Sequence, residues 1–242
     1  MAFQTQRRER PDPASLDLAD GTVTRVAQQA KDPDRASVFI DDAFAFGLAI
    51  DLVIEAGLKK GVVLTAGRQR ELLTRQETFA ARSAALSSIA HRARTTGEIS
   101  RMLTTKGFES ALVEDTVASL VASGLLDDAA YARAYAQARF QGPGHGPARI
   151  RQDLQRRGVA RDVIDVALAD LEDAEDLGAR ARRDAEKRWL SLASETDLRK
   201  RKKKTLDFLV RRGFSFDDAR QAVDAAEAEH PPGDEGAADW DD

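Results

Sequence analysis

Apolar side chains recur at the spacing of an amphipathic α-helix through most of the chain after residue 66. The clearest example is the stretch 146–169, where Ile150 and Leu154 form one apolar stripe and a second stripe follows Gly158. Gly158 stands at a position where the end of a helix favours a left-handed residue without a Cβ. The pattern therefore predicts two helices joined by a tight glycine turn.

The same pattern occurs three times, at intervals of about fifty residues. Any two amphipathic helices joined by glycine look alike, but here a basic residue, the glycine and an apolar residue keep register with both stripes three times. The triplets are Lys106-Gly107-Phe108, Arg157-Gly158-Val159 and Arg212-Gly213-Phe214. Each interval leaves room for one more helix, and a unit of this size buries its apolar face only against its neighbours. The sequence thus predicts a mainly α fold of tandem three-helix, helix-turn-helix-like repeats in an elongated array, over 66–125, 126–174 and 175–230.

The region before the repeats has the alternation typical of β-strands. Two apolar runs, 37–40 and 43–46, flank Asp41-Asp42 and predict two strands around a two-residue turn, although Asp-Asp is a weaker turn pair than Asp-Gly. Further strands are expected at 22–26 and 62–64, and a short helix at 51–56. These elements predict a small β-rich module over 20–65. The charged ends predict a disordered arm over 1–19 and a disordered acidic tail over 231–242.

The composition limits the class of protein. The chain has 242 residues, enough to bury a sizeable core in one or two domains. It has no cysteine, which excludes disulfides and thiolate metal sites and fits a reducing compartment. No apolar run approaches the ~20 residues of a membrane helix, and no apolar stretch follows the N-terminal charges as in a signal peptide. We therefore expect a cytoplasmic protein without membrane contact.

No residues form the pattern of a catalytic, cofactor or metal site. The glycine-rich stretch 141–147 lacks the preceding apolar strand and the Lys-Ser/Thr ending of a phosphate-binding loop, so we interpret it as a linker. Asp127 and Asp128 are expected to cap the following helix rather than to act as a catalytic pair. The histidines stand apart from other metal-ligating residues in the sequence; they are His91, His145 and His230. The sequence predicts a protein that is not an enzyme and has no metal or cofactor.

Basic side chains are the remaining candidates for a functional surface. The net charge of −4 conceals a basic run over 199–212 and an acidic C-terminal end. On a helix, Arg149, Arg156 and Arg157 share or adjoin one face, and a row of arginines suits phosphate groups or an acidic protein groove. The full candidate set is Arg133, Arg139, Arg149, Arg151, Arg156, Arg157, Lys200, Arg201, Lys202, Lys203 and Lys204.

Two other interpretations of these residues stay open. The arginines could form a solvated helix face balanced by acids, and the lysine run could be a disordered segment. Four aromatic residues could stack on bases, but their helical spacing favours packing in the core; they are Phe108, Tyr131, Tyr135 and Phe214.

The central repeat resembles a known family. Gly124-Leu-Leu-Asp-Asp128, Tyr131-Ala132 and Tyr135, followed by Arg139, Arg149-Ile150, Leu154 and Arg157-Gly158, are similar to the central repeat of the RecX regulatory proteins. The resemblance covers roughly 22–228, and VFIDDAFAFGL and GLKKG resemble the N-terminal segment of longer members. Two departures are Asp41-Asp42, where the family often has Asp-Gly, and Thr205, which stands in place of Ile in the third copy.

The resemblance implies a regulator of the RecA recombinase, active in recombination, DNA repair and the SOS response. RecX proteins bind RecA filaments along the helical groove, inhibit ATP hydrolysis and strand exchange, and also bind DNA. The implied partners are the RecA filament and single-stranded DNA, with double-stranded DNA as a further candidate, and a monomer is expected. The family has no catalytic residues to transfer, so the basic residues above are candidate RecA and DNA contacts only.

Two other functions compete with this one. An autonomous DNA-binding protein could use the helix–glycine–helix units as a transcriptional repressor, although a sequence-specific reader usually dimerises on a palindrome and no heptad dimerisation helix is evident. A structural adaptor without nucleic acid would leave the basic run unexplained.

Overall fold

The computed structural model describes residues 13, 16–142 and 144–231, so most of the predicted arm 1–19 and nearly all of the tail 231–242 lie outside the described residues. Two compact units are formed. Unit 1 comprises the described residues up to Arg94 together with Glu98–Leu126, and unit 2 comprises Thr95–Gly97 together with the described residues from Asp127 onward.

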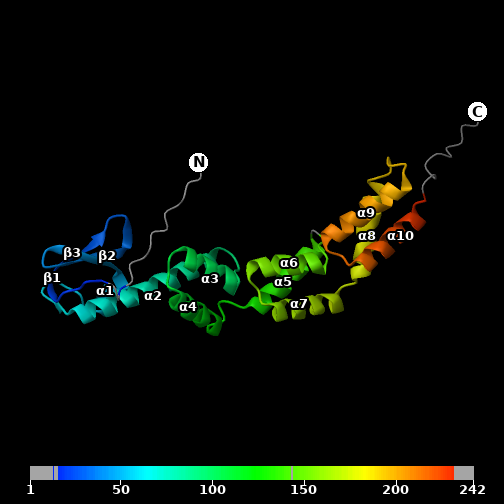
Figure 1. Cartoon of the computed structure of the whole chain (residues 1–242). Helices are drawn as coiled ribbons and strands as arrows, with labels where there is room; N and C mark the ends of the chain where they lie inside the picture. Colours follow the sequence, from blue (N-terminus) through cyan, green and yellow to red (C-terminus); the bar gives the residue numbers. More distant parts are fainter. Residues whose placement is uncertain (1–12, 14–15, 143, 232–242) are drawn as a thin grey trace, which may run out of the picture. The chain divides into compact units, whose positions relative to one another are not determined.

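Unit 1 begins with a four-stranded antiparallel sheet (Figure 1). Its strands are β1 (Gly21–Gln29), β2 (Asp32–Ile40), β3 (Ala43–Ala49) and β4 (Val63–Leu64), in the order β3-β2-β1-β4. The short helix α1 (Ile50–Glu55) lies between β3 and β4. Val23, Val38 and Leu48 of the sheet are fully buried in one cluster with Leu72 of helix α2 (Ala66–His91), which covers the apolar face of the sheet.

The predicted Asp41-Asp42 turn is confirmed. Both residues have positive φ, 47° and 65°, as a tight hairpin of this twist requires. Asp41 accepts a hydrogen bond from the backbone N–H of Thr22 through Oδ1 (3.0 Å), and the N–H of Asp42 donates to Thr24 Oγ1 (3.0 Å). These bonds to β1 stabilise a turn that has no glycine.

The rest of unit 1 is helical. The C-terminal half of α2 packs with α3 (Thr96–Thr105) and α4 (Ser110–Ala122) around Ala81, Ile99, Leu103 and Leu120. Phe108, which follows the turn at Gly107, is 5% exposed and belongs to the same core. Phe108 is therefore a packing residue, as its spacing predicted.

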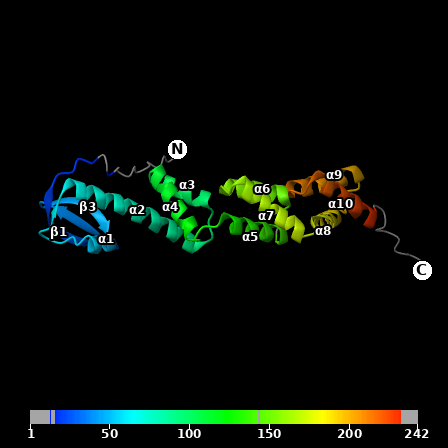
Figure 2. The same ribbon diagram turned by 90° about the horizontal axis from the view of Figure 1, so that it is seen from below.

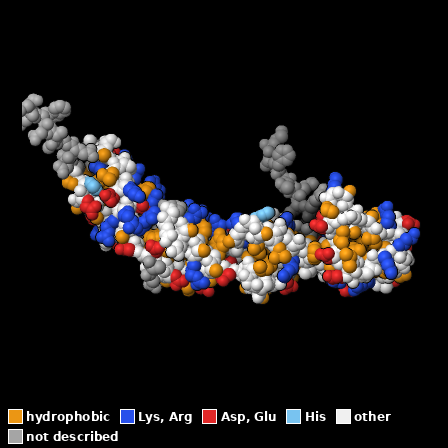
Figure 3. All heavy atoms as spheres, turned by 180° about the vertical axis from the view of Figure 1, so that it is seen from behind, with side chains coloured by type: hydrophobic (Ala, Val, Ile, Leu, Met, Phe, Trp, Pro, Cys, Tyr) orange, Lys and Arg blue, Asp and Glu red, His pale blue; other side chains and the backbone are white. Residues whose placement is uncertain are grey.

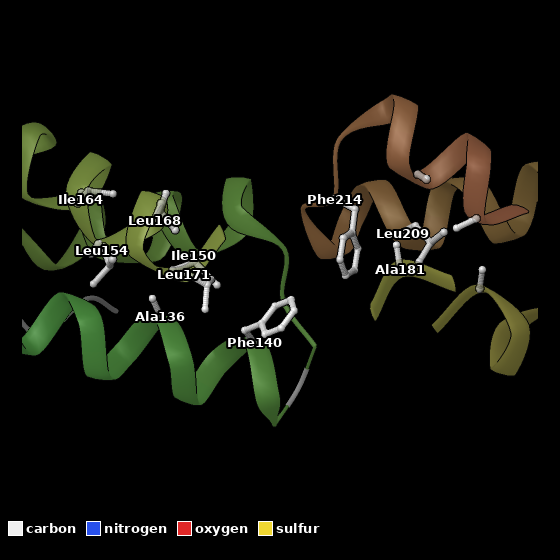
Figure 4. Packing of buried hydrophobic residues seen from close by; sticks show 14 of the residues in the cluster. Ala136, Phe140, Ile150, Leu154, Ile164, Leu168, Leu171, Ala181, Leu209 and Phe214 are labelled. Atoms are coloured by element: carbon white, nitrogen blue, oxygen red, sulfur yellow. The ribbon is translucent and has the colours of Figure 1, made fainter. Parts of the chain in front are cut away.

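Unit 2 consists of six helices in two groups of three. The first group is α5 (Asp128–Gln141), α6 (Pro147–Arg157) and α7 (Arg161–Ala174), and the second is α8 (Leu177–Leu190), α9 (Leu198–Arg212) and α10 (Phe216–Glu229). Figure 2 shows α8, α9 and α10 side by side, with α10 packed along α8. The buried apolar residues of both groups belong to one cluster, part of which is seen in Figure 4, with Ile150 and Leu168 in one group and Leu209 and Phe214 in the other.

The mainly helical fold with a small N-terminal strand module is confirmed. All three repeated glycines have a left-handed backbone, with φ of 85° at Gly107, 85° at Gly158 and 93° at Gly213. Helices α2–α4, α5–α7 and α8–α10 fall within the three predicted repeats, although the limits of those repeats stay a prediction. Thr205, which departs from the repeat pattern, is fully buried, and its hydroxyl donates to the carbonyl of Arg201 (2.9 Å).

A close backbone joint connects the two helix groups of unit 2. The start of α6 lies against the C-terminal end of α9: the N–H of Gly146 donates to the carbonyl of Arg212 (2.8 Å) and that of Ala148 to the carbonyl of Gly213 (3.1 Å). A Cβ on Gly146 or Gly213 would overlap backbone atoms of the other segment. A second joint of this kind lies earlier in unit 2, where Thr95 Oγ1 donates to the carbonyl of Arg157 (2.6 Å) and Gly97 contacts Gly158.

Candidate functional site

Two tyrosines on α5 organise the arginines of the central helices. Tyr131 and Tyr135 stack with ring centroids 6.1 Å apart and an interplanar angle of 13°. The guanidinium of Arg157 lies 4.8 Å from the centroid of the Tyr135 ring, and that of Arg139 lies 5.1 Å from it. Both tyrosines are partly buried against the apolar core of unit 2, so the predicted packing role is confirmed. The ring of Tyr135 also holds two arginines in place by cation–π contact.

Asp153 of α6 gathers two further arginines. Its carboxylate pairs with Arg156 and, at 3.7 Å, with Arg149, and it accepts a hydrogen bond from the hydroxyl of Tyr135 (3.3 Å). Partial burial acts to raise the pKa of Asp153, but the hydrogen bond from Arg156 and the charges of Arg149 and Arg156 outweigh it and lower the pKa. Asp153 therefore stays ionised, and one carboxylate faces two arginines.

We name Arg139, Arg149, Arg156 and Arg157, with Tyr135 and Asp153, the α5–α6 cluster. The structure brings together four of the eleven predicted contact residues at this place. Arg151 and Arg133 do not join it, because they pair with acids of α7: Arg151 with Asp165, and Arg133 with Asp170 at 3.8 Å.

A second pair of arginines, which sequence reasoning missed as contacts, adjoins the cluster. Arg212 donates to the buried Asp184 (2.7 Å), and Arg180 lies 3.4 Å from the same carboxylate. Arg180 also donates to the backbone carbonyl of Gln141 (3.2 Å). The sequence could have indicated Arg212, because it is the basic residue before the third repeated glycine. No comparable pattern in the sequence distinguishes Arg180.

His145 lies between these two groups of arginines. Burial lowers the pKa of its imidazole; the charge of Asp153 opposes this, and the charges of Arg139, Arg149 and Arg212 lower the pKa further. Its Nδ1 is buried without a hydrogen-bond partner among the described residues. The charges that act on this imidazole thus come from α5, α6 and α9, and the backbone contact between the start of α6 and the end of α9 brings the α5–α6 cluster close to Arg212.

The basic run proves to be an ordered helix, so the alternative of a disordered segment is wrong for the described residues. Lys200, Lys202 and Lys204 each pair with an acid: Lys200 with Asp197 (3.7 Å), Lys202 with Glu227 and Lys204 with Glu195 (2.6 Å). The hydrogen bond from Lys204 is the main reason that the pKa of Glu195 is lowered. Lys203 is exposed and makes no ion pair with any described residue.

Arg201 corrects the prediction that the whole run is a contact surface. Its side chain is 7% exposed and donates twice to the carbonyl of Trp189, at 2.8 and 3.1 Å, with the guanidinium 4.4 Å from the Trp189 ring. It faces inward because α9 turns one side toward α8, and position 201 lies on that side with Thr205 and Leu209. Arg201 is therefore a packing residue and not an exposed contact.

Exposed cations without an acid partner gather on the last three helices instead. Figure 3 shows blue side chains gathered over unit 2 on the face drawn there. Among the described residues of α8–α10, those that are exposed and make no ion pair are Arg182, Arg183, Lys187, Arg199, Lys203, Arg211 and Arg220. Unit 2 thus combines a set of arginines held by Tyr135 and Asp153 with several exposed cations that pair with no described acid.

One histidine has carboxylate neighbours that its sequence position did not reveal. His230 Nε2 lies 3.2 Å from Glu186 Oε1, although the two residues are far apart in the sequence. Glu229 adds a third ligand atom, and the ligand atoms of all three residues lie within 4.8 Å of one another. The prediction that His230 stands apart from possible metal ligands is therefore wrong.

Within the part of the chain that the structure describes, no helix combines the length and apolar character needed to cross a membrane.

Comparison with known proteins gives one consistent result along the chain. Four family models match in order: the regulatory protein RecX N-terminal domain at 21–65, and the first, second and third three-helix domains of RecX at 81–120, 127–168 and 175–223. All six residues of the α5–α6 cluster lie within the match to the second three-helix domain.

Individual relatives agree with the family models. A regulatory protein RecX of Leuconostoc citreum is 32% identical over 88% of this chain and 79% of its own length. One from Clostridium perfringens is 28% identical over 84% of this chain and 95% of its own. A crystal structure of regulatory protein RecX superposes with a TM-score of 0.65 at 25% identity, covering 84% of this chain and 99% of that one. The crystal structure of RecX from Lactobacillus salivarius, at 20% identity and a TM-score of 0.57, covers 63% of this chain and 97% of that one and shares the fold.

Proposed function

Since the chain belongs to the RecX family of regulatory proteins, which are not enzymes, we propose that it regulates the RecA recombinase by binding the RecA–DNA filament. Bound along the groove of the filament, it inhibits ATP hydrolysis and strand exchange, because it occupies the space that a second DNA needs and hinders coupling between RecA subunits. It acts in the cytoplasm as a monomer and has some affinity for single- and double-stranded DNA.

The observation that carries this proposal is the α5–α6 cluster. Arg149 and Arg156 share the one ionised carboxylate of Asp153, so these two arginines keep a surplus of positive charge. Tyr135 and Asp153 hold the guanidinium groups before any partner arrives, and less side-chain entropy is lost when an anion binds to arginines that are already ordered. A preorganised arginine set of this kind suits phosphates of DNA or carboxylates of an acidic groove.

The exposed cations of α8–α10 are a second observation that supports the proposal. They extend the basic region with lysines and arginines that no described acid neutralises, as expected for a surface that follows a charged filament. Arg201 is not among them because it is buried. Lys200, Lys202 and Lys204 stay as contacts of lower rank, because a partner must first compete with Asp197, Glu227 and Glu195.

The test is the DNA-dependent ATPase of RecA on single-stranded DNA, with the full chain titrated in. We expect inhibition at protein concentrations below that of RecA, and a rise of roughly tenfold in the half-inhibiting concentration for the triple variant Arg149→Ala, Arg156→Ala, Arg157→Ala. The matched control removes three exposed cations from unit 1, at Lys31, Lys59 and Lys60, and should inhibit like the unchanged chain. Circular dichroism confirms that each variant keeps its helices.

Two results would contradict the proposal. Equal inhibition by the cluster variant and the control would remove the α5–α6 cluster from the contact surface. No effect of the unchanged chain on ATP hydrolysis or strand exchange, with tight binding to one duplex sequence, would favour the autonomous DNA-binding repressor.

A further inference from the structure

The end of α10 meets α8 at a group of three side chains that the proposed function does not use. His230 follows the last residue of α10, and its Nε2 lies 3.2 Å from Oε1 of Glu186 on α8. Glu229 precedes it, and one ligand atom from each of the three residues lies within 4.8 Å of the others. The group therefore presents one imidazole nitrogen and two carboxylates at a single point.

The backbone at this point is fixed by a separate contact. The indole N–H of the buried Trp189 donates to the carbonyl of His230 (3.1 Å). Trp189 lies one turn after Glu186 on α8, so the same helix positions the carboxylate and anchors the residue that carries the imidazole. Two of the three side chains thus keep their relation to each other without any ion, and the exposed Glu229 is able to move toward them.

Electrostatics favour a cation among these groups. Two carboxylates close together repel each other, and a positive ion between them removes this repulsion. A divalent cation would neutralise both carboxylates and use the neutral imidazole as a ligand. In a tetrahedral zinc site with bonds of about 2.0–2.2 Å, ligand atoms lie about 3.4 Å apart, close to the present distance between His230 and Glu186.

We propose that Glu186, Glu229 and His230 bind a zinc ion, with water in the remaining position. Imidazole and carboxylate ligands suit zinc, and the chain has no cysteine to offer a competing thiolate site. The bound ion ties the C-terminal end of α10 to α8 and stabilises the last helix group of unit 2. This role is independent of binding to RecA or DNA.

The experiment is a calorimetric zinc titration of the full chain, without an affinity tag, in the background Trp240→Phe, which leaves Trp189 as the sole tryptophan. We expect one saturable site, a change in Trp189 fluorescence with the same midpoint, and a melting temperature that rises by about 5–10 °C when free zinc is about 100 times Kd. Glu186→Gln and His230→Gln should each weaken binding at least roughly tenfold.

Two controls separate this site from other zinc ligands of the chain. His91→Gln removes an exposed histidine of α2 and should bind zinc like the unchanged chain. A second variant tests whether the acidic tail binds zinc: the five tail acids are replaced by their amides, and they are Asp234, Glu235, Asp239, Asp241 and Asp242. The proposal is overturned if no saturable zinc binding occurs, if Glu186→Gln and His230→Gln bind as tightly as the unchanged chain, or if only the tail variant loses the ion.

Discussion

Arg201 and Lys203 stand two positions apart on α9 and lie in opposite environments. Arg201 is buried and donates to the carbonyl of Trp189, whereas Lys203 is exposed and unpaired among the described residues. Sequence reasoning treated both as equal members of one basic run. It could not separate them, because the difference depends on which side of α9 faces α8.

We predict that Arg201→Ala lowers the free energy of unfolding of unit 2 by about 2–4 kcal/mol. The change removes two hydrogen bonds and a cation–π contact and leaves the carbonyl of Trp189 with fewer donors. Lys203→Ala should change the free energy by less than about 0.5 kcal/mol. Urea denaturation followed by Trp189 fluorescence, again with Trp240 replaced by Phe, measures both; equal losses would refute the buried role of Arg201.

The lowered pKa of His145 predicts that the free energy of unfolding falls as the pH falls. Its lowered pKa in the folded chain means that the unfolded chain binds the proton more tightly, so unfolding takes up protons near the ordinary histidine range. Stability contributed by the neutral ring is therefore complete above about pH 6.5, the unfolded value, and is lost as the pH falls toward the lower folded value.

We expect His145→Gln to flatten this loss between about pH 7 and pH 5. His91→Gln, which changes an exposed histidine, should leave the profile as it is. Urea midpoints at a series of pH values supply the measurement, and a profile that stays the same in His145→Gln would exclude His145 as its source.

Asp153 affects stability at lower pH: its lowered pKa adds stability that is present above about pH 3.8 and lost as the pH falls through the folded value.

At the scale of the helices, the repeated glycine turns were the most predictable feature and the joints between them the least. The spacing of Gly107, Gly158 and Gly213 marked each turn, because a left-handed helix end has a strong preference for glycine. The contact of the Gly213 turn with the start of α6 had no comparable signal. Gly146 was interpreted as part of a linker, yet it packs against backbone.

Gly213→Ala should therefore lower the free energy of unfolding by more than the loss of a left-handed glycine alone explains. The new Cβ would overlap the backbone nitrogen of Arg149 in addition to straining the turn, and we predict a loss of about 3 kcal/mol or more. Gly124→Ala is the matched control: its φ is 72°, but nothing lies within 4 Å of the added Cβ, so about 1 kcal/mol is expected. Denaturation followed by circular dichroism compares the two, and equal losses would count against the close joint.

The candidate site was only partly predictable from the sequence. Helical spacing placed Arg149, Arg156 and Arg157 together correctly, since neighbours on one helix follow from its period. Arg139 joined them through Tyr135, and Arg133 and Arg151 were drawn to acids of α7. Partners on other helices depend on tertiary packing, which a single sequence does not encode in any local pattern.

At the scale of the whole chain, the net charge of −4 hides a basic surface on unit 2. The proposed binding of single-stranded DNA by the free chain should therefore weaken steeply as salt increases, because each neutralised phosphate releases counterions. Replacing Arg149, Arg156 and Arg157 by Ala should reduce the slope of log K against log salt by about 2, at about 0.7 for each contact. Fluorescence anisotropy over a salt series gives the slope, and an unchanged slope would place the DNA contacts elsewhere.

The joint between α9 and α6 gives unit 2 a direction. Carbonyls at the negative end of α9 accept hydrogen bonds from N–H groups at the positive end of α6, so the two helix dipoles meet head to tail. The start of α9 has no such partner among the described residues; Asp197 caps it and accepts from the N–H groups of Arg199 and Lys200. An acidic side chain thus replaces the carbonyls that a following repeat would supply. Asp197 thus occupies the place where a turn of another repeat would contact α9, and engineering a fourth repeat onto this end would first require its replacement by a small residue.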